Sequence, residues 1–161
     1  AENNIENFYL NDKCAAGTGS FITEVAERGG INIAEMSDLA AKSSYKKELN
    51  SFCTVFAKTE IMSWLFEGLP VEDIARGIYL SILNRVIKLR IDPSAPVFLI
   101  GGVIAWHPYL KNLLHEKLQQ EVQIIDKPQF AVSFGAALFA KEAFQKGITK
   151  ETEINISTHK T

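Results

Sequence analysis

Residues 11–21, NDKCAAGTGSF, place a cysteine and a Gly-Thr-Gly turn directly before an amphipathic run. Small residues let main-chain N–H groups approach a phosphate closely, and the positive end of the following helix favours an anion. Plain turns that open a helix share this pattern, so the loop alone is a weak indication of a nucleotide site. Cys14 stands at the same helix start, which favours its thiolate, although a lone cysteine there is also a common small buried residue.

The second cysteine, Cys53, lies in SFCTVF (51–56), whose alternating pattern predicts a strand that ends just before a helix. The ends of neighbouring strands in an α/β domain gather at the edge where ligands bind. Two thiolates there, doubled by a two-fold axis, would give four cysteine ligands for an iron–sulfur cluster. Zinc is the chemical alternative, and purely structural cysteines remain another.

A second glycine motif, FLIGGV (98–103), follows a short apolar strand. Gly101 and Gly102 permit close backbone approach to a flat ligand such as adenine, although a tight turn explains them equally well. The histidines show no metal-ligand spacing, and we expect His107 to start a helix and His115 to face solvent. Trp64 and Trp106 are expected in the core or an interface. No catalytic residue is predicted, because Glu60 and Asp73 have no partner at a spacing that suggests acid–base catalysis.

The elements that must position these residues follow from hydrophobic periodicity and from glycine and proline positions. The predicted order is a strand over 7–12, helices from residue 19 and over 32–43, a strand over 51–56, helices over 57–69 and 71–90, a strand over 95–102, a helix over 107–119, a strand over 121–125 and a helix over 131–144. This order predicts an α/β domain over 1–144 with a partly parallel sheet, followed by a polar tail or linker over 145–161.

Composition limits the class of protein. The chain has 161 residues, which is one domain, with 47% hydrophobic and 22% charged residues. A net charge of −2 and a pI of 6.0 give no electrostatic case for nucleic acid or a membrane surface. No apolar run approaches the roughly 20 residues that span a bilayer, and AENNIENF is not a signal peptide. We expect a cytoplasmic protein with reduced cysteines.

Five segments together, NDKCAAGTGSF, CTVFAKTEI, EDIARGIYLSILNRV, FLIGGV and QFAVSFGAALFA, resemble in order the C-terminal half of the BadF/BadG/BcrA/BcrD ATPase family. The likeness covers about residues 7–143 and is strongest to the activators of 2-hydroxyacyl-CoA dehydratases, the CoA-substrate-specific enzyme activases. It implies a ribonuclease-H-like domain of the actin-like, sugar-kinase and Hsp70 ATPase fold, with a mixed sheet and flanking helices. The domain would be incomplete at its N-terminus, with further strands preceding this chain.

The resemblance also implies a site. Members of this family are homodimers that hold one [4Fe-4S] cluster between the subunits, and the matching metal ligands here are Cys14 and Cys53. The residues implied to contact ATP or ADP with Mg²⁺ are Ala15, Ala16, Gly17, Thr18 and Gly19 near the phosphates, and Gly101, Gly102 and Val103 near the adenosine. ATP hydrolysis would drive a low-potential electron into a dehydratase or a benzoyl-CoA reductase-type partner.

Some positions depart from the family pattern. Lys58 and Thr59 stand where the family has Glu and Ser, and Trp106 or His107 stands near an expected Asn. The Asp-Ile-Gly-Gly-type phosphate motif should precede this chain, so we expect the 161 residues alone not to hydrolyse ATP appreciably. The alternative function is a non-redox actin-like nucleotide-binding or dimerisation module with structural cysteines.

Overall fold

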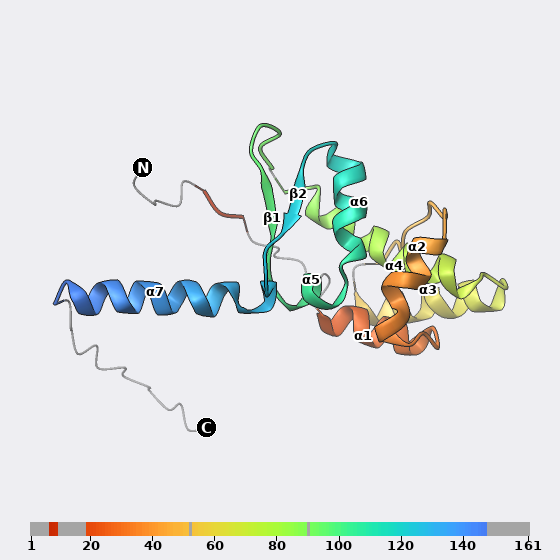
Figure 1. The fold of residues 1–161 in the computed structure, drawn as a ribbon. Coiled ribbons are helices and arrows are strands. Elements are labelled where there is room, and N and C mark those ends of the chain that lie inside the picture. The colour runs from red at the N-terminus through yellow and green to blue at the C-terminus, as the bar shows by residue number, and fades with distance from the viewer. Residues whose placement is uncertain (1–6, 10–18, 52, 90, 148–161) are drawn as a thin grey trace, which may run out of the picture. The chain divides into compact units, whose positions relative to one another are not determined.

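The computed structural model describes residues 7–9, 19–51, 53–89 and 91–147 (Figure 1). The elements in chain order are α1 (Gly19–Arg28), η1 (Ile33–Glu35), α2 (Met36–Lys42), α3 (Thr54–Phe66), α4 (Val71–Val86), β1 (Val97–Leu99), α5 (Gly102–Trp106), α6 (Tyr109–Leu118), β2 (Val122–Ile124), η2 (Pro128–Phe130) and α7 (Ala131–Gln145). Contacts divide the chain into two compact units, Ala1–Gln129 and Phe130–Thr161. Each unit is described by itself.

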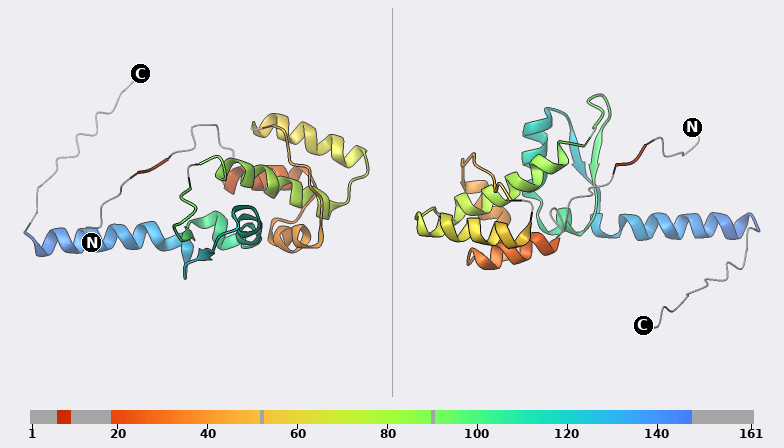
Figure 2. Two further views of the ribbon diagram at one scale, coloured as in Figure 1. Left: turned by 90° about the horizontal axis from the view of Figure 1, so that it is seen from above. Right: turned by 180° about the vertical axis from the view of Figure 1, so that it is seen from behind.

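The first unit is organised around α4. The sequence predicts an apolar stripe of Ile74, Ile78, Ile82 and Val86; the three isoleucines are buried, and Val86 is partly buried against the core. Helices α1, α2 and α6 all contact α4, which lies among them (Figure 2). Pro70 precedes the first turn as N-cap, where its missing N–H costs nothing. The helix ends at Val86, earlier than the predicted range.

Helix α1 confirms the amphipathic run after the Gly-Thr-Gly turn. The residues that it buries are Phe21, Ile22, Val25 and Ala26. The chain then reverses at Gly29–Gly30, where Gly30 adopts a φ of 66° that favours glycine. Ile31 N donates to Ala26 O at 2.9 Å and closes the turn. Helix α1 packs along α3, so the start of α1 has a fixed place in the first unit.

The two described strands, β1 and β2, are parallel, as the sequence predicts, with Val97 opposite Val122 and Leu99 opposite Ile124. Helices α5 and α6 connect them, and α6 packs against β2. The strand predicted over 95–102 is present as Val97–Leu99, but its apolar pattern, which is typical of a buried strand, does not bury it. Phe98 is 54% exposed, because the sheet within the described residues has two strands and Phe98 lies on its open face.

The predicted strand over 51–56 is also wrong. Thr54 begins α3, and Cys53 is its N-cap. Alternation within the segment 51–56 is too short to specify a strand, whereas Ala57, Ile61 and Trp64 are buried at helical spacing and set the register of the helix. Of the predicted strand over 7–12, residues 7–9 have no regular secondary structure, and residues 10–12 lie outside the described residues.

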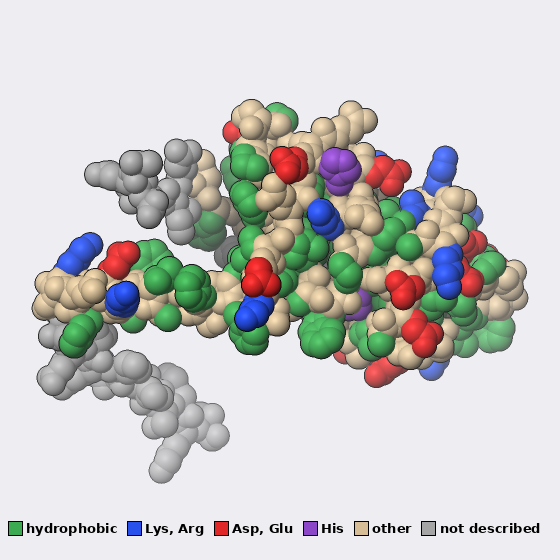
Figure 3. Space-filling model, in the orientation of Figure 1, with side chains coloured by type: hydrophobic (Ala, Val, Ile, Leu, Met, Phe, Trp, Pro, Cys, Tyr) green, Lys and Arg blue, Asp and Glu red, His purple; other side chains and the backbone are tan. Residues whose placement is uncertain are grey.

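The second unit contains α7, which confirms the predicted helix over 131–144. Its exposed large apolar side chains are Phe130, Val132, Phe134, Leu138, Phe139 and Phe144, and hydrophobic side chains line this helix in Figure 3. The same view of the molecule shows acidic and basic side chains intermixed. The predicted division into 1–144 and 145–161 stays a prediction, because residues 148–161 lie outside the described residues. None of the described helices has the length and apolar character needed to cross a bilayer.

Candidate functional site

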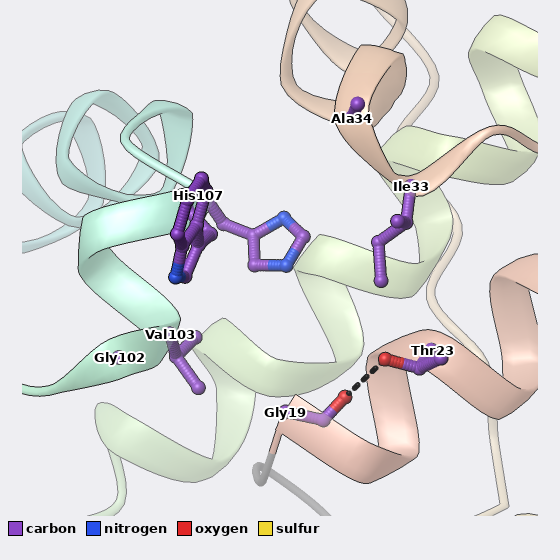
Figure 4. A pocket seen from close by; sticks show the side chains of 8 residues that line it. Gly19, Thr23, Ile33, Ala34, Gly102, Val103 and His107 are labelled. Atoms are coloured by element: carbon purple, nitrogen blue, oxygen red, sulfur yellow. Dashed lines mark hydrogen bonds between the residues drawn. The ribbon is translucent and has the colours of Figure 1, made fainter.

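One cavity of about 760 Å³ brings the two glycine motifs together (Figure 4). Its walls come from the start of α1, from η1, and from α5 with the residue that follows it. The lining residues are Gly19, Thr23, Ile33, Ala34, Gly102, Val103, Trp106 and His107. Three of the eight residues that the family resemblance implies for a nucleotide therefore line a single concave site.

Gly19 forms the wall on the α1 side. A Cβ built on Gly19 would lie 4.0 Å from Cγ2 of Val103, which faces it from α5. One turn further along α1, Thr23 Oγ1 donates to Gly19 O at 3.1 Å and keeps its hydroxyl on the helix (Figure 4). The buried face of α1 holds this wall in place, so the cavity depends on the packing of the helix rather than on contacts within the site.

Gly101 and Gly102 turn the chain from β1 into α5. Gly101 has a φ of 101°, a conformation that other residues rarely adopt, and its N–H donates to Pro128 O at 2.8 Å. Gly101 supports the cavity without lining it, whereas Gly102 and Val103 reach it. Ile104 points to the other side of the short helix and is buried, which fixes the rotation of α5.

His107 is the buried polar group of the wall. It is 4% exposed, and its ring projects between Val103 and Ile33 (Figure 4). Its Nδ1 lies 2.7 Å from the hydroxyl of Tyr79 on α4, which in turn lies 3.2 Å from Ser37 Oγ on α2. Burial lowers the pKa of His107 and raises the pKa of Tyr79 to about 12. The expectation that His107 starts a helix is wrong, since it lies between α5 and α6.

The two tryptophans have different places. Trp64 is 7% exposed and lies edge-on to Tyr45 in the core, as expected. Trp106 is 78% exposed at the cavity rather than in the core. Thr23, Ile33 and Ala34 were not predicted as site residues. Thr23 could have been predicted to line the cavity, because it follows Gly19 by one helical turn. Ile33 and Ala34 of η1 could not, because their location depends on the turn that follows α1.

Cys53 has a partly exposed free thiol at the start of α3. Its side chain makes no capping hydrogen bond, and its main chain is held by Ser51, whose Oγ accepts from Cys53 N and donates to Cys53 O, both at 3.2 Å. Glu60 on α3 holds the preceding residues by accepting from Asn50 N at 2.9 Å and Ser51 N at 3.3 Å. The thiol thus stands on an ordered segment and remains available as a ligand.

Two predicted site residues that the structure describes, Cys53 and Gly101, do not line the cavity. Cys14, Ala15, Ala16, Gly17 and Thr18 lie outside the described residues. In the part of the chain that the structure describes, no three His, Cys, Asp or Glu side chains lie together as a metal site.

The other titratable residues considered in the sequence have structural contacts. Asp73 accepts from Ser43 Oγ at 2.6 Å, and Glu60 holds the segment before Cys53. His115 is exposed, as expected, and its Nδ1 lies 2.8 Å from Gln120 O, which accepts from it. Within the described parts of the chain, these contacts place neither carboxylate in an acid–base pair.

Sequence comparison shows the relationship of the chain to known proteins. Residues 1–140 match the BadF/BadG/BcrA/BcrD ATPase family. The 2-hydroxyisocaproyl-CoA dehydratase activator of Clostridioides difficile is 37% identical over 136 residues, which cover 83% of this chain and 51% of that protein. The chain therefore spans about half the length of this curated relative.

Structure comparison agrees. The (R)-2-hydroxyglutaryl-CoA dehydratase component A of Acidaminococcus fermentans matches with a TM-score of 0.79 and 36% identity, over 89% of this chain and 56% of that one. The 2-hydroxyisocaproyl-CoA dehydratase activator of Clostridium difficile with bound ADPNP matches with a TM-score of 0.75 and 32% identity, over 91% and 56%. These matches confirm the actin-like ATPase fold. The chain belongs to the BadF/BadG/BcrA/BcrD ATPase family.

Proposed function

We propose that this chain is the nucleotide-binding and cluster-bearing half of an ATP-dependent activator. The whole protein would supply a low-potential electron to a 2-hydroxyacyl-CoA dehydratase or a benzoyl-CoA reductase-type partner. The observation that carries the proposal is the cavity in which Gly19 faces Gly102 and Val103, since both family motifs contribute to it. A similar protein of known structure binds the ATP analogue ADPNP.

The cavity suits a nucleotide. Helix α1 has ten residues and begins at Gly19, so its first N–H groups lack partners within the helix and its positive end favours phosphate oxygens. Residues 15–18, which immediately precede it, would extend this anion site. Gly102 and the side chain of Val103 would then lie beside the nucleoside, with Mg²⁺ bound through the phosphates and through residues of the other half of the protein.

The surroundings of Cys53 suit a thiolate ligand of a [4Fe-4S] cluster. Its thiol is partly exposed and makes no capping bond at the start of the 13-residue α3. A cluster of this type takes four thiolates, so Cys14 and Cys53 from each of two chains would complete the set. When bound, the cluster would supply one-electron transfer at low potential.

The packing of α1 on α3 offers a path between the two functions. Helix α1 forms a wall of the cavity, and α3 starts at Cys53. The two helices contact each other, and Lys58 Nζ of α3 lies 2.6 Å from Glu24 Oε2 of α1. Movement of the start of α1 on nucleotide binding would therefore reach the helix that carries Cys53. In this way nucleotide state would change the geometry around the thiolates.

Anaerobic reconstitution of the chain with iron and sulfide tests the proposal. We expect a broad absorbance near roughly 400 nm and about four irons per two chains, both lost in Cys14→Ala and in Cys53→Ala. Ser63→Ala, on the exposed side of α3, is the control that should keep the cluster. A folded wild-type chain that takes up no cluster under these conditions contradicts the redox function. If it still binds ADPNP, the non-redox nucleotide-binding alternative is correct.

A further inference from the structure

The imidazole of His107 lies in a wall that is otherwise largely apolar. Ile33, Ala34 and Val103 give the cavity hydrocarbon surface, and the hydroxyl of Thr23 is already bonded to the main chain of its own helix. Sites for small molecules commonly combine apolar walls with one or two placed polar groups that fix orientation. His107 has the position of such a group, because its ring extends from the end of α5 toward Ile33 across the cavity (Figure 4).

A chain of hydrogen bonds connects His107 to Tyr79 and Ser37. Burial lowers the pKa of the imidazole and raises the pKa of Tyr79 to about 12, so both are neutral at physiological pH. Either hydroxyl of the Ser37–Tyr79 pair can donate, and we assign Ser37 Oγ as the donor, which leaves the phenol proton to donate to His107 Nδ1 at 2.7 Å. A neutral imidazole that accepts at Nδ1 carries its proton on Nε2. Within the described residues, Nε2 has no hydrogen-bond partner in the protein.

Trp106 precedes His107 and lines the same cavity with 78% of its surface exposed. An indole left open at the edge of an apolar site offers a flat face on which an aromatic ligand can stack. The other tryptophan of the chain, Trp64, is buried in the core against Tyr45. Trp106 and His107 therefore add an aromatic face and one N–H donor to the part of the cavity beside Gly102.

Building on the proposed nucleotide function, we propose that His107 is a specificity-determining residue that donates from Nε2 to an acceptor nitrogen of a purine base, with the base stacked on Trp106. Tyr79 and Ser37 are positioning residues that keep the proton of His107 on Nε2. The ligand class is a purine nucleotide. A purine offers both a large stacking face and ring nitrogens that accept a hydrogen bond, and the cavity of about 760 Å³ has room for it.

Calorimetric titration of the chain with ADPNP and Mg²⁺ tests the donor. His107→Phe keeps an aromatic ring but has no N–H, so we expect its affinity to fall by about tenfold. His107→Gln, whose amide nitrogen takes the place of Nε2, should bind within about threefold of the wild type. His115→Phe, an exposed site on α6, is the control and should bind normally. Equal affinities for the wild type and a folded His107→Phe would overturn the inference.

A purine analogue that lacks one acceptor gives an independent readout. The analogues are the 1-deaza, 3-deaza and 7-deaza forms of ADP, and we expect one of them to bind the wild type about tenfold more weakly than ADP does. The His107→Phe variant should bind that analogue and ADP with equal affinity, because it has already lost the donor. If His107→Phe does not fold, Tyr79→Phe takes its place, because it leaves the imidazole but removes the donor to Nδ1. Uniform binding of all three analogues to the wild type overturns the inference.

Tryptophan fluorescence tests the stacking. ADPNP should quench the emission of the wild type, and Trp106→Leu should abolish the quenching and weaken binding by about three- to tenfold. Quenching that persists in Trp106→Leu contradicts the stacked base. A wild-type chain that binds no nucleotide overturns the proposed function itself, whereas normal binding with no effect of Trp106 or His107 overturns this inference alone.

Discussion

Gly19 faces Val103 across the cavity, and a Cβ on Gly19 would lie 4.0 Å from Cγ2 of Val103. That distance is an ordinary van der Waals contact, so a methyl group fits between the start of α1 and α5. A longer side chain would have to extend into the space that lies between the two glycine motifs. The space between the start of α1 and α5 is therefore open because Gly19 has no side chain to fill it.

Replacing Gly19 tests this relationship. Gly19→Ala should leave the affinity for ADPNP within about twofold of the wild type, whereas Gly19→Leu should weaken it by about tenfold or more by filling the cavity. Both variants should fold, because Gly19 is the first residue of a helix and alanine and leucine favour helix more than glycine does. Calorimetric titration checks the result, and equal affinities for the two variants would show that the nucleotide lies elsewhere.

Gly77 of α4 lies against the ring of Trp64. A Cβ built on Gly77 would lie 2.6 Å from Cζ3 of Trp64, closer than any real contact, and Trp64 cannot retreat freely because Tyr45 lies edge-on to it. We expect Gly77→Ala to lower the free energy of unfolding by about 1–3 kcal/mol, measured by urea denaturation. Gly135→Ala, in a helix with open space around it, is the matched control and should not destabilise. A stabilised Gly77→Ala would show that the ring moves aside at no cost.

The sequence predicts the helices well, because their apolar residues recur at helical spacing and glycines or prolines mark their ends. The stripe of Ile74, Ile78 and Ile82 is an example, and each of these residues is buried. The wrong prediction of a strand over 51–56 arises because the local pattern there does not match the helical packing of the segment that follows. The short alternating pattern over 51–56 resembled a strand, and the buried side of α3 from Ala57 onward overrode that local pattern.

Only part of the candidate site is predictable. Gly19, Gly102 and Val103 belong to recognisable motifs, and they do line one cavity. The place of His107 follows instead from contacts between distant segments, since its partner Tyr79 is on α4 and no local pattern connects the two. An exposed Trp106 also reverses the usual expectation for tryptophan, because the cavity edge rather than the core surrounds it.

Glu60 links α3 to the segment that carries Cys53. Its carboxylate accepts from Asn50 N at 2.9 Å and Asn50 Nδ2 at 2.8 Å, and from Ser51 N at 3.3 Å. Glu60→Gln replaces one acceptor oxygen with a donor, so we expect a loss of about 1 kcal/mol in unfolding free energy and faster bleaching of a reconstituted cluster in air. Thermal unfolding and absorbance decay measure the two effects.

The matched control for this change is Glu67→Gln, at the other end of α3. Among the described residues, the carboxylate of Glu67 accepts only from Ser63 Oγ, at 3.0 Å on the exposed side of the helix, and Glu67 is distant in sequence from Cys53. We expect Glu67→Gln to change the unfolding free energy by less than about 0.5 kcal/mol and to leave the rate of bleaching unchanged. Similar behaviour of the two variants would mean that Glu60 does not position the segment before Cys53.

Stability should fall in mild acid because of His107. Burial holds its pKa below the usual 6.5, so between the folded-state pKa and 6.5 the unfolded chain binds a proton at this imidazole that the folded chain does not. The stabilisation is complete above pH 6.5 and is lost as the pH falls through the folded-state pKa, and urea denaturation across pH 5–8 measures it. His107→Gln cannot titrate and should flatten this part of the curve, whereas His115→Gln, at an exposed histidine, should keep the wild-type slope. A slope that His107→Gln leaves unchanged would assign the acid sensitivity to other groups.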